Sequence, residues 1–78
     1  MNIGGLYCLR ISKDIWDNVE MEGFTTGQKV ESDESFVVLV AFYFSQIRKR
    51  MHLKVLTTSG TVGWIAYVDK DIIMEVTP

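Results

Sequence analysis

Residues 53 to 65 read L-K-V-L-T-T-S-G-T-V-G-W-I, and this stretch decides the fold that we expect. Two short β-rich runs, residues 53–57 and 62–65, are separated by small or polar residues, which is the pattern of a tight β-hairpin. Gly60 stands where such a short connection needs a residue that tolerates a positive φ angle. We therefore expect the rest of the chain to close a small barrel around this hairpin.

The side chains of this hairpin separate onto two faces. Because successive residues of a strand point to opposite sides, Leu53, Val55 and Thr57 share one face. Lys54 and Leu56 belong to the opposite face, so one face is more apolar than the other.

A glycine precedes the large aromatic residue of the second run. Gly63 inside a strand indicates a close backbone approach or a bulge at a corner of the barrel. The ring of Trp64, which follows directly, can then fold over the end of the barrel.

Length and composition limit the chain to one small domain. With 78 residues, of which 47% are hydrophobic, we expect a single folded domain over residues 1–78 and no cleft between domains. The formal net charge of -2 gives no reason to expect a nucleic-acid partner. The single cysteine, Cys8, cannot form an internal disulfide, which suits a reducing compartment. Since the longest apolar run, residues 36–44, is too short to cross a bilayer as a helix, we expect a cytoplasmic protein or, if a phage encodes it, a virion component.

The remaining chain predicts further short elements. Strands are expected at residues 6–11, 28–31, 36–44 and 72–76. Residues 12–26 show no strand alternation and are expected to form an excursion loop, with a short helix as the alternative. Residues 66–71 are expected to form a single helical or 3₁₀ turn before the last strand. Five or six short antiparallel strands without a long helix predict an all-β fold, a small barrel whose closure removes most free strand edges.

The strand at residues 36–44 is the strongest of these, because Val, Phe and Tyr dominate it and neither Gly nor Pro interrupts it. Both of its faces are apolar, and the first carries Phe36, Val38, Val40, Phe42 and Phe44. Such a strand is either central and strongly bent, or covered at one end by a partner. Self-association through Phe36–Phe44 is therefore one function that we consider, as a homo-oligomer or a structural virion component.

The second half of the chain carries a recognisable order of features. Residues 53–76 hold an alternating strand, a Gly-containing turn, a Gly-aromatic-aliphatic triplet and the expected 3₁₀ turn before a final apolar strand. This order resembles the bacterial and phage SH3-like domains of the SH3b type. Residues 23–30, G-F-T-T-G-Q-K-V, are similar to the turn that follows the first long loop in that family. The resemblance implies an SH3-like barrel.

The same resemblance suggests two aromatic groove residues. In eukaryotic-type SH3 domains, which share the architecture, two tyrosines help to line a groove for proline-rich peptides, and Tyr7 and Tyr67 stand in comparable places. Ala66 replaces the usual proline, and no Trp opens the strand at His52 and Leu53. Because polyproline recognition needs stacked aromatic ridges, these departures point to another protein ligand.

We expect the partner surface between the long loop at residues 12–26 and the turn at residues 66–71. Trp16 would be an apolar anchor ringed by acids, which would steer basic partners toward it. The alternative is that Trp16 plugs the open end of the barrel. The residues expected to contact a partner are Tyr7, Asp14, Trp16, Asp17, Glu20, Trp64 and Tyr67.

Other chemistry finds little support in the sequence. Cys8 and His52 are the only candidates for a nucleophile and its base, and one Cys with one His gives no ligand set for zinc, so we expect no enzyme, no metal and no cofactor. The basic run of Arg48, Lys49 and Arg50 supports nucleic-acid binding as an alternative. The sequence therefore predicts a non-catalytic binding module that contacts another protein, as a small adaptor or accessory subunit.

Overall fold

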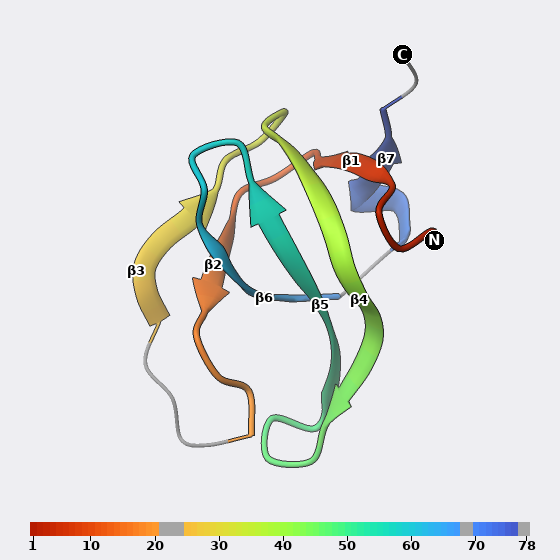
Figure 1. Cartoon of the computed structure of the whole chain (residues 1–78). Helices are drawn as coiled ribbons and strands as arrows, with labels where there is room; N and C mark the ends of the chain where they lie inside the picture. The colour runs from red at the N-terminus through yellow and green to blue at the C-terminus, as the bar shows by residue number, and fades with distance from the viewer. Residues whose placement is uncertain (21–24, 68–69, 77–78) are drawn as a thin grey trace.

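A computed structural model describes residues 1–20, 25–67 and 70–76 and shows an all-β fold (Figure 1). Its strands are β1 (Leu6–Leu9), β2 (Lys13–Trp16), β3 (Thr25–Val30), β4 (Ser35–Ser45), β5 (Arg50–Thr57), β6 (Val62–Ala66) and β7 (Ile73–Glu75). One 3₁₀ turn, η1 (Lys70–Ile72), comes directly before β7. The predicted all-β class is confirmed.

All of these strands belong to one antiparallel sheet. Its strand order is β3-β2-β6-β5-β4-β1-β7, so β3 and β7 are the two edges. The strands curve around a common interior (Figure 1), but in the described part of the chain the edges do not pair, and the sheet is not closed into a barrel. The described strands number seven, so the prediction of five or six strands was too low.

The additional strand, β2, and the first residues of β3 come from the stretch that we expected to be an excursion loop. β2 and β3 form a hairpin in which Asp14 lies opposite Lys29, and the register shifts between Asp14 and Trp16. This bulge breaks the alternation of a strand that is only four residues long, which hides it from pattern analysis. Ile15 of β2 is fully buried and fixes the hairpin on the core. Residues 21–24, including the start of the expected turn, lie outside the described residues.

The hairpin of β5 and β6 forms as predicted. Gly60 has a φ angle of 89° in its turn, and the Thr57 hydroxyl accepts a hydrogen bond of 3.1 Å from the Thr61 N–H. Leu53, Val55 and Thr57 are buried, and Leu56 on the opposite face is exposed. The period-two assignment of this strand is confirmed.

The core lies on the concave side of the sheet. Its buried hydrophobic residues are Tyr7, Leu9, Ile15, Val30, Phe36, Val38, Leu53, Val55 and Ile65. They come from β1 to β6, so the core depends on pairing between segments far apart in the sequence. Each fully buried aliphatic or aromatic side chain contributes roughly 1.5–3 kcal/mol, which makes this cluster the main source of stability.

β4 pairs regularly with β5 only over its first half. Phe36 and Val38 are buried as expected, but the register against β5 then shifts twice, between Val38 and Val40 and between Val40 and Tyr43. Phe42 lies within the second shift and has a φ angle of 57°. The prediction that Phe36, Val38, Val40, Phe42 and Phe44 share one face is therefore wrong at Val40, which the first shift pairs with Lys54 on the side away from the core. The second shift reverses the change, so Phe44 pairs with Met51 on the same side of the sheet as Phe36 and Val38.

Gly63 is a position where the fold leaves no room for a larger residue. A Cβ atom on this residue would lie 2.8 Å from the backbone oxygen of Trp16 and would collide with the side chain of Ile15. We expect Gly63→Ala to destabilise the fold by about 2 kcal/mol or more, because backbone and core must both move. Urea unfolding measures the change. Val62→Ala, at an exposed neighbouring residue, is the control and should cost less than about 1 kcal/mol; equal losses for the two variants would refute the close approach.

Candidate functional site

The structure divides the predicted contact residues between two places. Tyr7 and Tyr67 line a pocket beside β1 and β7. Trp16 and Trp64 are instead directly paired across β2 and β6, on the side of the sheet away from the core.

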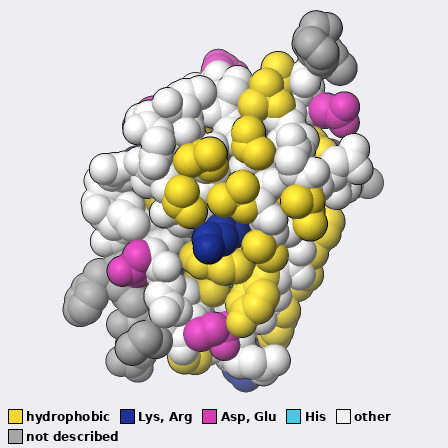
Figure 2. Space-filling model, viewed as in Figure 1, with side chains coloured by type: hydrophobic (Ala, Val, Ile, Leu, Met, Phe, Trp, Pro, Cys, Tyr) yellow, Lys and Arg dark blue, Asp and Glu magenta, His cyan; other side chains and the backbone are white. Residues whose placement is uncertain are grey.

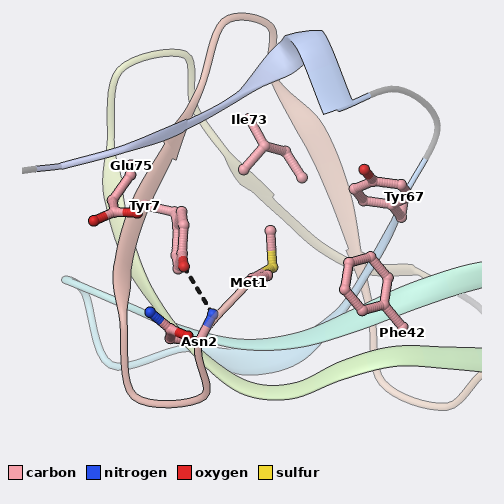
Figure 3. A pocket seen from close by; sticks show the side chains of 7 residues that line it. All are labelled: Met1, Asn2, Tyr7, Phe42, Tyr67, Ile73 and Glu75. Atoms are coloured by element: carbon pink, nitrogen blue, oxygen red, sulfur yellow. Dashed lines mark hydrogen bonds between the residues drawn. The ribbon is translucent and has the colours of Figure 1, made fainter.

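The pocket has a volume of about 320 Å³ and is open to solvent (Figure 3). Its lining comes from the N-terminal segment, β1, β4, β7 and the residue after β6, and consists of Met1, Asn2, Tyr7, Phe42, Tyr67, Ile73 and Glu75. Figure 3 shows the Met1 side chain between Tyr7 on one side and Phe42 with Tyr67 on the other. Most of the lining side chains are aromatic or aliphatic, the carboxylate of Glu75 is the single charged side chain, and polar atoms provide the larger share of the exposed lining.

One wall of the pocket is an aromatic pair. The rings of Phe42 and Tyr67 meet edge to face, with centroids 5.2 Å apart and an interplanar angle of 82°. The Phe42 side chain is 43% exposed. Its backbone occupies the left-handed region, which a bulky residue rarely adopts. Such strain persists only where the surroundings fix it, and it concentrates at binding sites. Sequence analysis placed Phe42 on a face of the strand at residues 36–44 and not at a pocket. No local sequence signal indicates the register shift that turns its ring toward Tyr67.

The opposite wall is rigid. Tyr7 is only 5% exposed, and its hydroxyl accepts a hydrogen bond of 2.8 Å from the Asn2 N–H (Figure 3). The hydroxyl of this core residue is therefore satisfied without a ligand. Glu75 is exposed and lies directly opposite Tyr7 in the register of β1 and β7. A ligand that places an apolar group between the aromatic walls can thus place a cationic group against the carboxylate of Glu75.

The two tryptophans lie in a second cluster, on the outer side of the sheet. The Arg48 guanidinium carbon lies 3.7 Å from the centroid of the Trp16 ring, and the Tyr43 ring lies 5.0 Å from that of Trp64. Both tryptophans are half-buried. Trp16 is therefore not a buried plug of the core, and Arg48 covers it.

Arg48 also contacts the single histidine. The Arg48 Nε–H donates to His52 Nε2 over 3.2 Å, and His52 Nδ1 lies 3.1 Å from the Arg50 carbonyl oxygen, to which it can donate. This arrangement holds a neutral imidazole, and both of its nitrogens are occupied. Of the basic run, Arg48 is half-buried between Trp16 and His52, whereas Lys49 and Arg50 are exposed.

The segment that follows β2 is tied to the turn between β4 and β5. The Ser45 hydroxyl donates to the Val19 carbonyl oxygen and accepts a hydrogen bond of 3.0 Å from the Arg48 N–H. Glu20 reaches Tyr43, whose pKa is raised by desolvation first and by the charge and hydrogen bond of Glu20 second. Asp14 and Asp17 are exposed.

Comparisons with known families and proteins add no assignment. Neither a family model, nor a curated protein, nor a solved structure matches the chain. Within residues 1–20, 25–67 and 70–76, no three His, Cys, Asp or Glu side chains are grouped so that they could hold a metal ion. No helix of the described chain has the length and apolar character needed to cross a membrane.

The buried imidazole makes the stability of the fold depend on pH. Burial lowers the pKa of His52 below its ordinary value of 6.5, and the charges of Arg48 and Arg50 lower it further, against the opposing effects of the Arg50 carbonyl and Glu20. Below pH 6.5 the unfolded state therefore binds more protons than the folded state, so stability should fall as the pH falls from about 7 to 5.

Urea unfolding of the wild type and of His52→Gln over this pH range measures the effect. The variant lacks the titrating group and should lose much less stability on acidification, since ordinary carboxylates titrate at lower pH. The same slope in both proteins would show that His52 is protonated as easily in the folded state as in the unfolded state.

Proposed function

We propose that the protein is a non-catalytic binding module that holds an extended segment of another protein at the pocket between Phe42, Tyr67 and Tyr7. The observation that carries this proposal is the left-handed backbone of Phe42, which turns an exposed aromatic ring into the pocket wall. A strained residue with an exposed ring is better explained by contact with a ligand than by stability. A small adaptor or an accessory subunit would use such a site.

The arrangement of elements supports an SH3-like relationship as part of this proposal. A hairpin, β2–β3, follows the first strand; β4, β5 and β6 then pair in sequence, and a 3₁₀ turn leads to the last strand. From β5 to β7 this is the order that the resemblance in the sequence implies. His52, at the place where a groove tryptophan would stand, is fully buried, so the outer aromatic ridge of a polyproline groove is lacking there.

The chemistry of the pocket suggests what enters it. Aromatic and aliphatic walls favour an apolar side chain, because burying it removes apolar surface from water on both partners. Glu75 at the pocket favours a lysine or arginine next to that side chain. We therefore expect a partner segment in which an apolar residue has a basic neighbour.

The alternative functions have weaker support. Nucleic-acid binding by the basic run would have to proceed without Arg48, which is held between Trp16 and His52. Self-association through Phe36–Phe44 would have to use its second half, because Phe36 and Val38 are buried in the core. Nucleic-acid binding by the basic run does not account for the strained backbone of Phe42.

Replacement of the strained residue tests the proposal. Phe42→Ala removes the ring from the pocket and should reduce capture of a partner from cell lysate at least about tenfold. Its cost in stability should stay below about 1.5 kcal/mol, because the side chain is substantially exposed. Quantitative mass spectrometry of captured proteins and urea unfolding give the two readouts.

The matched control is Ile47→Ala, which truncates an apolar residue of similar exposure in the turn between β4 and β5. It should leave capture unchanged. If Phe42→Ala captures the same proteins in the same amounts as the wild type and Ile47→Ala, the pocket is not the binding site.

A further inference from the structure

The outer side of the sheet carries two rows of side chains that run across the strands. Directly paired residues of antiparallel strands lie on the same face, so the register defines each row. The first row crosses β1, β4, β5 and β6 and consists of Leu6, Val37, Leu56 and Val62. The second crosses β4, β5, β6 and β2 and consists of Val40, Lys54, Trp64 and Trp16. We call these eight residues the outer face.

The outer face is apolar although it faces away from the core. Leu6, Leu56 and Val62 of the first row are 40%, 36% and 46% exposed. An antiparallel sheet with one solvated side normally carries polar residues there, whereas seven of these eight residues are apolar. Figure 2 shows the resulting hydrophobic area around one basic side chain, with Asp and Glu side chains toward its margins. A contiguous apolar area of this kind indicates a surface that another molecule covers.

Lys54 is the single charged residue of the outer face. Its ammonium lies 5.8 Å from the centroid of the Trp64 ring, and it is half-buried among apolar neighbours. Within the described chain the structure gives Lys54 this ring contact and no ion pair. A molecule that covers the outer face would remove this ammonium from water, which is costly unless the molecule brings an anion to it.

We propose that the outer face docks a second protein segment, in which a carboxylate side chain flanked by apolar residues binds Lys54. The apolar flanks would cover the two rows, and the carboxylate would form the ion pair that Lys54 lacks within the described chain. This partner differs from that of the pocket, where the charged group is the carboxylate of Glu75.

Charge distinguishes this occupant from two others. A second copy of the chain, docked by a two-fold axis through the centre of the outer face, would bring Lys54 against Lys54, and like charges oppose such a contact. A nucleic acid gains affinity from several cations along its path. The outer face offers two cations, Lys54 within its rows and Arg48 over the Trp16 ring, and the carboxylate of Glu20 lies beside Tyr43, which packs on Trp64.

Three synthetic peptides test the proposal. Each has the sequence Val-Leu-X-Leu-Val between solubilising serines, with capped ends, and X is Glu, Gln or Lys. Binding is followed by tryptophan fluorescence, because Trp16 and Trp64 belong to the outer face. The wild type should bind the Glu peptide about tenfold more tightly than the Gln peptide and should bind the Lys peptide most weakly.

Variants of Lys54 link this preference to the residue. Lys54→Glu should reverse it and favour the Lys peptide, and Lys54→Met, which keeps the apolar stem, should abolish the difference between Glu and Gln. Lys29→Glu makes the same charge change at an exposed residue of the edge strand β3 and should retain the wild-type order.

Several results would overturn the proposal. They are equal affinity of the wild type for the three peptides, no binding of any peptide at about 1 mM, or displacement of the Glu peptide by an oligothymidine. Sedimentation that shows a dimer strengthened by Lys54→Met would assign the outer face to a second copy of the chain instead.

Discussion

The double register shift of β4 against β5 is the constraint on which the surfaces of this protein depend. Before the shifts, Phe36 and Val38 point into the core. At the second shift, the side chains of two consecutive residues lie on two different surfaces. Phe42 contacts Tyr67 at the pocket, while the next residue, Tyr43, packs on Trp64 outside. A regular strand would also send adjacent residues to opposite sides, but it would send one of them into the core. The shifts leave both aromatic rings exposed at the surface.

The parts of the fold that are fixed by local sequence could be predicted. The β5–β6 hairpin follows from a turn that needs Gly60 and from alternation around Leu53 and Val55, and neither depends on distant residues. The 3₁₀ turn before the last strand was also expected at nearly its observed place. The importance of Gly63 could be predicted as well, although its neighbours, Ile15 and the Trp16 backbone, could not.

The parts that arise from pairing between distant segments could not be predicted. β2 offers one buried residue, Ile15, and a bulge beside it, so its pattern is that of a loop. The pocket requires Phe42 in a left-handed backbone conformation that its residue type does not predict. The position of Lys54 between Val40 and Trp64 follows from the strand register, which the sequence pattern does not reveal. The structure places Tyr7 and Tyr67, which the resemblance suggested as groove residues, in the lining of one pocket, whereas the tryptophans that sequence analysis grouped with them lie on another side of the sheet.

The adjacency of Phe42 and Tyr43 also has a thermodynamic consequence. The two residues share one stretch of irregular backbone, yet their rings belong to different surfaces. A ligand that binds Phe42 in its left-handed conformation therefore also favours the present position of Tyr43 against Trp64. Linkage requires the effect to be mutual, so a molecule that holds Tyr43 in place raises affinity at Phe42 by the same factor. For two ligands bound at these residues, the irregular backbone of β4 would be the direct route of coupling.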